Sequence, residues 1–211
     1  MVEFHIVNLR DFGKGSYRQI DDKPFGGGSG MVLMAEPLFK AIDHAMDLVG
    51  GPDNVRVIYP SPQGKTWNQE IAEETSQQEK LIVICGHYKG IDERVMEKYV
   101  THEYSLGDFV MTGGEIPAMV MLDSTVRLIP GTLNNLDSAL TDSFSQDLLD
   151  HPHYTHPREI NGMEVPQVLL GGYHAKIEAW RQEQKEKRTQ EKKPDLWRKF
   201  EKLKESEINH A

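Results

Sequence analysis

The sequence has a single cysteine, Cys85, among its 211 residues. One cysteine cannot form an internal disulfide framework, so we expect a chain that works in a reducing, cytoplasmic compartment. No apolar run is long enough to span a bilayer, and the first residues lack the basic-then-apolar order of a secretory signal. These absences exclude a disulfide-stapled domain and predict no membrane partner. The length allows one substantial core or two smaller ones.

Basic residues are scarcer than acidic ones, with 24 Lys or Arg against 33 Asp or Glu, so the formal net charge is −9. The scarcity is uneven, because Lys176 to Lys204 contains 11 Lys or Arg against 6 Asp or Glu, while the rest has 13 against 27. Such a basic segment on an acidic body can hold a nucleic acid. It can equally be the solvated, salt-bridged surface of a helix. Charge alone leaves both interpretations open.

Short apolar runs alternate with segments of helical spacing in the first two thirds of the chain. Val55–Tyr59 and Lys80–Cys85 are typical of buried parallel strands, and Glu3–Asn8 predicts a further strand. Helices are expected at Glu36–Leu48, Asn68–Gln77, Asp92–Tyr99 and Glu115–Leu128. This alternation predicts an α/β fold with a largely parallel sheet.

Three loops that contain glycine follow the predicted strands. They are PSPQG at 60–64, GHYKG at 86–90 and SLGDFVMTGG at 105–114. Glycine lets a main chain approach a ligand closely, and ligands of open α/β sheets bind beyond the carboxyl ends of the strands. The three loops together therefore predict a small-molecule pocket. GGGSG at 26–30 is weaker support for a nucleotide site, because no phosphate-binding lysine follows it.

The C-terminal third has a different composition. A polar segment at 130–143 is followed by HPHYTHP, a predicted strand at Val165–Leu170, and two predicted helices, one from His174 and one after Pro194. The spacing of His151, His153 and His156 is not a recognised zinc pattern. We expect these histidines to contact phosphate or to cap local structure. Trp180, Trp197 and Phe200 are expected to pack between helices.

Taken in order, several motifs resemble the bacterial tRNA (guanine-N1)-methyltransferases, the TrmD family of the SPOUT class. They are DDKPFGGGSGM, YPSPQG, CGHYKGIDERV, SLGDFVMTGGEIPA, VRLIPG, TDSF, PHYTHP and GMEVPQVLLGGYHAKI. The resemblance extends from about Asn8 to Pro194. It implies methylation of N1 of the guanine 3′ of the anticodon, guanine 37, with S-adenosylmethionine (AdoMet) as methyl donor.

The resemblance also implies an architecture and partners. Residues 1–131 would form a trefoil-knotted α/β SPOUT domain with a mostly parallel sheet, 132–143 an interdomain linker, and 144–211 a small helical tRNA-binding domain. The implied partners are the anticodon arm of tRNA and a second copy of the chain in a homodimer. Dependence on Mg²⁺ is implied as well, with no metal ligand assigned.

The family's functional residues can be carried over to matching positions. AdoMet binding falls on the three glycine loops and the helix start after them, at Pro62, Gly64, Gly86, Leu106, Gly107, Asp108, Phe109, Val110, Met111, Gly113, Gly114 and Pro117. Contact with tRNA is assigned to Lys89, His153, Tyr154, Lys185, Lys187 and Arg188. Phosphate contacts by the basic segment would make tRNA binding strongly salt-dependent.

The catalytic roles fall on Asp142 in TDSF and Arg127 in VRLIPG. The resemblance makes Asp142 the general base that removes the proton from guanine N1, and Arg127 the cation near the guanine oxygen. By the residues alone, Asp142 can be a capping acid in a linker and Arg127 a surface arginine at a helix end.

Two departures from the family pattern bear on activity. Lys89 stands where the family has glutamate, which reverses a charge beside the expected methyl donor. The chain also begins where family members have already completed a first strand and helix, which leaves a sheet edge exposed. A non-catalytic or impaired relative that binds AdoMet or tRNA is therefore the alternative function.

Overall fold

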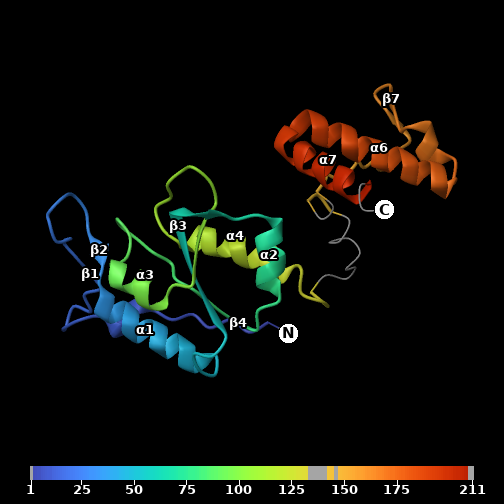
Figure 1. The fold of residues 1–211 in the computed structure, drawn as a ribbon. Coiled ribbons are helices and arrows are strands. Elements are labelled where there is room, and N and C mark those ends of the chain that lie inside the picture. The colour runs from blue at the N-terminus through green and yellow to red at the C-terminus, as the bar shows by residue number, and fades with distance from the viewer. Residues whose placement is uncertain (1, 133–141, 145–146, 209–211) are drawn as a thin grey trace. The chain divides into compact units, whose positions relative to one another are not determined.

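The computed structural model describes residues 2–132, 142–144 and 147–208, and the side chains only as far as residue 206. The chain forms two compact units, Met1–Asn134 and Asn135–Ala211 (Figure 1). Most of the linker expected at 132–143 lies outside the described residues. No helix in the described part of the chain is long and apolar enough to cross a membrane.

A parallel three-stranded sheet forms the centre of the first unit. β3 (Val55–Thr66) lies between β4 (Lys80–Val83) and β5 (His102–Ser105). β3 is buried from Arg56 to Ser61, as a strand covered on both faces must be. The expected α/β class with a mostly parallel sheet is confirmed.

Helices cover both faces of this sheet. Successive residues of β3 point to opposite faces, so Val57 packs with α1 (Ala35–Leu48) and α3 (Glu93–Tyr99). Ile58 packs instead with α2 (Gln69–Ser76) and α4 (Glu115–Val126). The result is a helix–sheet–helix arrangement with one core on each face (Figure 1). All four helices lie within two residues of their expected bounds.

Three details of the first unit differ from the sequence-based expectations. The strand expected at Glu3–Asn8 is wrong: these residues pair with no strand among the described residues, and Ile6 is 98% exposed. β3 does not end at Tyr59 but continues to Thr66, with a register shift between Pro60 and Lys65. β4 ends at Val83, two residues before the expected end at Cys85.

The remaining small elements of the first unit precede α1. They are the 3₁₀ helix η1 (Leu9–Phe12) and an antiparallel pair, β1 (Asp21–Asp22) with β2 (Val32–Leu33). Leu33 also forms a parallel bridge to Ile91. This bridge brings the end of the glycine-rich loop at 24–31 beside GHYKG.

The second unit is mainly helical. α6 (His174–Lys192) packs on α7 (Pro194–Ile208), and Pro194 starts the second helix because proline is well suited to the first helical position. A small hairpin joins β6 (Glu159–Ile160) to β7 (Met163–Glu164). The strand expected at Val165–Leu170 is wrong. Pro166 instead caps the 3₁₀ helix η2 (Gln167–Leu170), since proline lacks the N–H that a strand ladder needs.

Candidate functional site

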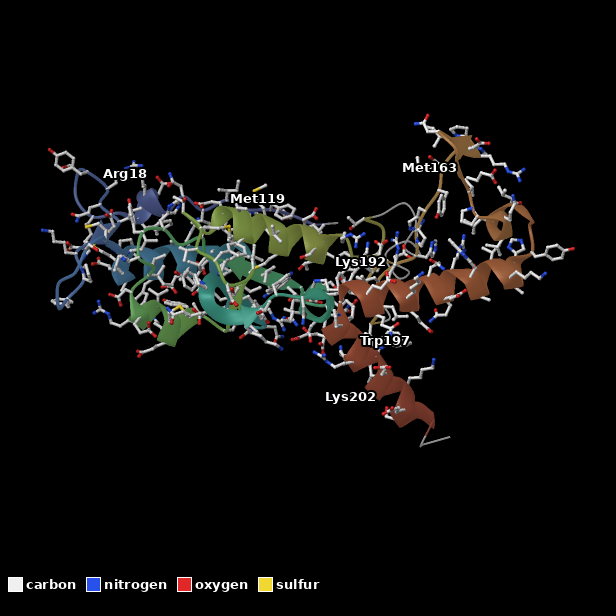
Figure 2. All side chains as sticks on the ribbon, turned by 90° about the horizontal axis from the view of Figure 1, so that it is seen from above. Arg18, Met119, Met163, Lys192, Trp197 and Lys202 are labelled. Atoms are coloured by element: carbon white, nitrogen blue, oxygen red, sulfur yellow. The ribbon has the colours of Figure 1, made fainter. Side chains whose placement is uncertain are left out.

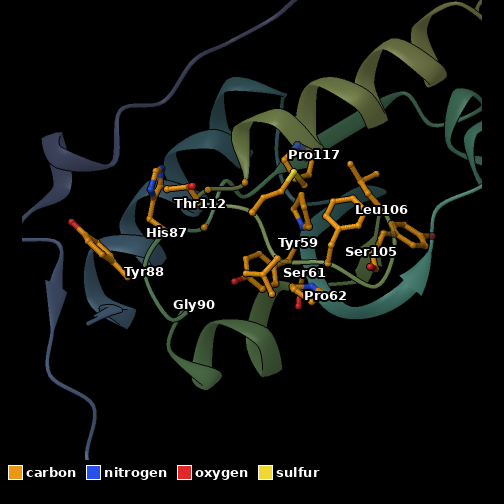
Figure 3. A pocket seen from close by; sticks show the side chains of 18 of the residues that line it. Tyr59, Ser61, Pro62, His87, Tyr88, Gly90, Ser105, Leu106, Thr112 and Pro117 are labelled. Carbon is orange, nitrogen blue, oxygen red and sulfur yellow. The ribbon is translucent and has the colours of Figure 1, made fainter. Parts of the chain in front are cut away.

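Loops after the three parallel strands form a pocket in the first unit (Figure 3). They converge because the carboxyl ends of parallel strands lie at the same edge of a sheet. The lining residues come from these loops and from the start of α4: Tyr59, Pro60, Ser61, Pro62, Gly86, His87, Tyr88, Lys89, Gly90, Tyr104, Ser105, Leu106, Gly107, Phe109, Val110, Met111, Thr112, Gly113, Gly114 and Pro117.

Most of the residues expected to bind a cofactor are brought together here. All of them line the pocket except Gly64 and Asp108. Asp108 is exposed. Gly64 lies where β3 passes β5, and a Cβ there would be 2.4 Å from the backbone nitrogen of Tyr104. Gly64 therefore allows β3 and β5 to approach closely. It affects the pocket through this packing and does not line it.

The pocket also contains residues that sequence reasoning missed. Tyr59 is one of them, and its ring lies against Gly86, where a Cβ would come within 2.8 Å of a ring carbon. Burial raises the pKa of Tyr59, as does the nearby Glu103, so its hydroxyl stays protonated. Ser61, His87 and Thr112 were missed as well. Each lies within a family motif and directly beside a residue assigned to AdoMet binding, and this position could have pointed to them.

Hydrogen bonds of the Ser105 hydroxyl and of the backbone fix the loop after β5. The hydroxyl of Ser105 donates to the carbonyl oxygen of Gly107 at 3.0 Å and accepts from the N–H of Gly107 at 3.1 Å. Gly107 adopts φ +146°, a conformation that favours glycine. The N–H of Phe109 then donates to the Gly107 carbonyl at 2.9 Å. Leu106 and Phe109, on either side of this turn, both line the pocket, and Figure 3 shows Leu106 beside Ser105.

The loop after β4 is joined directly to the start of α4. The N–H of Gly114 donates to the carbonyl oxygen of Gly86 at 2.8 Å. Nε2 of His87 lies 2.6 Å from Oε1 of Glu115. This hydrogen bond is the main reason why the pKa of Glu115 falls below its ordinary value of 4.5. Two contacts, one of backbone and one of side chains, therefore close this side of the pocket.

Among the described residues that line the pocket, Lys89 is charged and His87 is titratable. Its N–H donates to the carbonyl oxygen of Met31 at 3.0 Å. A Cβ on Gly30 would lie 2.9 Å from Cγ of Lys89, so the glycine-rich loop passes directly over this side chain. The pocket is otherwise neutral and rich in backbone groups, which suits a ligand with an uncharged ring system.

The two expected catalytic residues belong to different units. Arg127 follows the last turn of α4 and is half-buried. Asp142 is half-buried in the second unit. Neither lines the pocket of the first unit. Their expected roles therefore stay predictions.

The tRNA-contact residues of the second unit lie around α6. His153 and Tyr154 line a hollow with His151, Trp180 and other residues. Lys185, Lys187 and Arg188 lie on α6, with Lys187 exposed and the other two half-buried. His153 and His151 come together with Asp150, which sequence reasoning missed, whereas His156 is not part of this group.

Comparisons with known proteins agree over nearly the whole chain. The family model described as tRNA (Guanine-1)-methyltransferase TrmD matches residues 1–199. A tRNA (guanine-N(1)-)-methyltransferase of Brevibacillus brevis is 51% identical over 95% of this chain and 81% of its own length. Proteins of the same name from Staphylococcus carnosus and Clostridioides difficile are 53% and 47% identical, over 95% and 94% of this chain and 80% and 86% of their own lengths.

Proposed function

The chain belongs to the tRNA (guanine-1)-methyltransferase TrmD family, and we propose that it methylates N1 of the guanine 3′ of the anticodon, guanine 37. The methyl donor is AdoMet. The observation that carries the proposal is the convergence of the β3, β4 and β5 loops on one pocket, whose described lining is uncharged apart from Lys89 and the titratable His87. Relatives that share half of the sequence are named for this reaction, which favours an active enzyme over a non-catalytic relative.

The pocket fits the donor. Adenine and ribose need close main-chain contacts, and the pocket lining includes five glycines, whose backbone is not covered by a side chain: Gly86, Gly90, Gly107, Gly113 and Gly114. Apolar side chains such as Leu106 can hold a flat ring. When bound, AdoMet supplies an activated methyl group on a sulfonium, so the protein's main task is to position donor and acceptor.

The acceptor needs more than positioning, because guanine N1 carries a proton. We assign Asp142 as the base that accepts this proton while the N1 electron pair attacks the methyl carbon and the carbon–sulfur bond breaks. Negative charge that builds on the guanine oxygen would be stabilised by Arg127. The basic residues Lys185, Lys187 and Arg188, with His153 and Tyr154, would contact the anticodon arm, and Lys89 would lie beside the reacting guanine.

A homodimer is part of the proposal. One side of α4 packs into the core, while Ile116, Met119 and Val120 on α4 are 64%, 68% and 44% exposed. Figure 2 shows where Met119 lies on this helix. An apolar helix surface of this kind is suited to a second copy of the chain. Action in the cytoplasm, where tRNA and AdoMet meet, is proposed with it.

Dependence on Mg²⁺ is proposed without a protein site. Mg²⁺ prefers oxygen ligands, and no carboxylate is among the described residues that line the pocket. The pocket lining therefore does not fit this ion, and we assign it no step.

The test is transfer of radiolabelled methyl to tRNA transcripts with guanine or adenine 3′ of the anticodon. The wild-type chain should label only the guanine transcript. Asp142→Asn and Arg127→Ala should each lower the rate by about 10²-fold or more while AdoMet binding is retained. Asp195→Asn, an exposed carboxylate of the second unit, is the control. A folded wild-type chain that transfers no methyl would overturn the proposal.

A further inference from the structure

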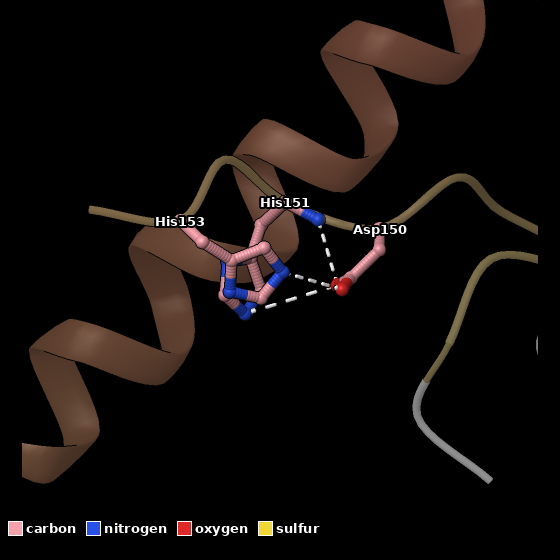
Figure 4. A group of neighbouring side chains, drawn as sticks. All are labelled: Asp150, His151 and His153. Atoms are coloured by element: carbon pink, nitrogen blue, oxygen red, sulfur yellow. Dashed lines mark hydrogen bonds and ion pairs between the residues drawn. The ribbon is translucent and has the colours of Figure 1, made fainter. Parts of the chain in front are cut away.

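A short turn in the second unit brings three potential metal ligands around one point (Figure 4). The donor atoms of Asp150, His151 and His153 all lie within 4.8 Å of one another. Nε2 of His153 is 2.8 Å from one carboxylate oxygen of Asp150, and Nε2 of His151 is 3.8 Å from the other. Tetrahedral ligands with metal bonds of about 2.0–2.1 Å lie about 3.4 Å apart. The two observed separations fall on either side of that spacing.

A backbone contact fixes the orientation of the His151 ring. Nδ1 of His151 lies 3.1 Å from the carbonyl oxygen of Pro152. A carbonyl oxygen can only accept, so Nδ1 is the donor, and in the neutral ring Nε2 carries a lone pair. This lone pair lies 3.8 Å from Oδ1 of Asp150, so a metal ion placed between the two groups would contact both. Metal-bound histidines commonly donate their second nitrogen to a carbonyl in this way.

The backbone that carries these side chains is held in place. The N–H of Leu149 donates to Oγ1 of the fully buried Thr189 at 2.8 Å, and the N–H of Asp150 donates to Ser143 at 3.0 Å. The side chains of Asp150 and His151 are 22% and 13% exposed, whereas that of His153 is 69% exposed. Two ligands are thus sheltered and positioned, and the third leaves an open side where water can complete a coordination shell.

We propose that Asp150, His151 and His153 bind a divalent transition-metal ion, with Zn²⁺ as the preferred ion. Two imidazole nitrogens and one carboxylate oxygen are ligands that Zn²⁺ and Co²⁺ accept, whereas Mg²⁺ prefers oxygen alone. The site lies within the second unit and does not depend on the proposed methyl transfer. A bound ion would tie the turn at 150–153 together beside the hollow that His153 and Tyr154 line.

Lys185 is the residue that competes with a metal ion here. Its Nζ lies 3.9 Å from Oδ1 of Asp150 and supplies positive charge to the carboxylate. A metal ion bound to Asp150 would therefore be repelled by the ammonium group of Lys185, whose side chain is only 15% exposed. Removal of this ammonium group should tighten metal binding, whereas it would only destabilise a cluster that serves as a structural ion pair.

The experiment uses the full chain after treatment with a chelator and dialysis. We expect calorimetry with Zn²⁺ to give one ion per chain, and Co²⁺ to give the visible absorption of a low-coordinate ion. His153→Ala should weaken Zn²⁺ binding by about ten-fold or more, because a ligand is lost. His156→Ala, in the same loop but outside the cluster, should leave it unchanged. Lys185→Met should tighten binding a few-fold.

The proposal is overturned if the wild-type chain binds no Zn²⁺, or if His153→Ala binds Zn²⁺ as tightly as wild type. His151→Ala and Asp150→Asn should also weaken Zn²⁺ binding. Circular dichroism should accompany each titration. Because His153 is mostly exposed, His153→Ala should fold, and its result decides the question even if a variant at His151 or Asp150 is unfolded.

Discussion

Nε2 of His87 lies 2.6 Å from Oε1 of Glu115, and this pair joins the loop after β4 to the first turn of α4. The two residues are far apart in the sequence. His87 lines the pocket, and Glu115 lies between the lining residues Gly114 and Pro117. The side chains are 45% and 55% exposed, so solvent screens the pair and its contribution to global stability is small. The main effect of the pair is to hold the two segments that shape the pocket.

Glu115→Gln should therefore weaken AdoMet binding about two- to five-fold at pH 7, because a charge-assisted hydrogen bond becomes a neutral one. The lowered pKa of Glu115 means that its carboxylate, the charged acceptor of this hydrogen bond, is present above pH 4.5 and is lost as the pH falls through the folded-state pKa. Calorimetry at pH 7, where the Glu115 carboxylate is charged, should show this preference for the wild-type chain over the variant. Glu70→Gln, also in the first turn of a helix, is the control. Equal affinities for all three proteins would contradict this role.

Gly114→Ala should remove most AdoMet binding. A Cβ at this position would lie 2.7 Å from the backbone nitrogen of Gly86 and 2.8 Å from Cα of Cys85, so backbone must shift. Such overpacking costs about 1–3 kcal/mol of the free energy of unfolding, and we expect AdoMet affinity to fall about ten-fold or more. Gly171→Ala is the matched control, because its Cβ would meet no atom closer than 3.7 Å. Thermal unfolding and AdoMet titration of both variants check the prediction, which fails if they behave alike.

Lys89→Glu should tighten the binding of AdoMet. The wild-type ammonium group repels a sulfonium in the same pocket, and a carboxylate would attract it. Lys89 is exposed, so each effect is worth at most about 1 kcal/mol and the affinity should rise about two- to ten-fold. S-adenosylhomocysteine has no sulfonium charge and should show little change, and Lys23→Glu, outside the pocket lining, controls for net charge. A gain that is equal for both ligands would refute the electrostatic explanation.

Met119→Asp should convert the proposed dimer to a monomer. Met119 is 68% exposed in an apolar surface of α4, and a carboxylate there would lose its hydration in an interface with a second copy. Sedimentation at micromolar concentration should give twice the chain mass of 24.0 kDa for wild type and a single chain mass for the variant. Met163→Asp, at a comparably exposed methionine in β7 of the second unit, should stay dimeric. A monomeric wild-type chain would exclude this interface.

Sequence patterns predicted the regular elements well where the burial pattern was unambiguous. The helices α1 to α4 and the continuous apolar strand β4 were expected from spacing alone, and all are present. The two wrong strands have local causes. Glu3–Asn8 has the alternation of a strand but no pairing strand among the described residues, and Val165–Leu170 contains Pro166, which favours a 3₁₀ start.

The candidate pocket was predicted less completely than the fold. The glycine loops pointed to most of its walls, because glycine marks close backbone approach. Tyr59 and His87 were missed, since a side chain that reaches a pocket from a strand end or across a loop has no signature of its own. Gly64 belongs to PSPQG, which was expected to be a loop that binds AdoMet, yet the close contact of Gly64 is with β5.

The sequence by itself determined the family, the parallel α/β sheet and the loops that carry the pocket, because these depend on motif order, on the alternation of apolar residues and on glycine. Only the tertiary structure decided which side chains meet. The pairing of His87 with Glu115 depends on how α4 packs against the loop after β4. The turn that carries Asp150, His151 and His153 is anchored by the hydrogen bond from Leu149 to Thr189 of α6. Distances between side chains of separate elements are set by packing, and no local pattern encodes them.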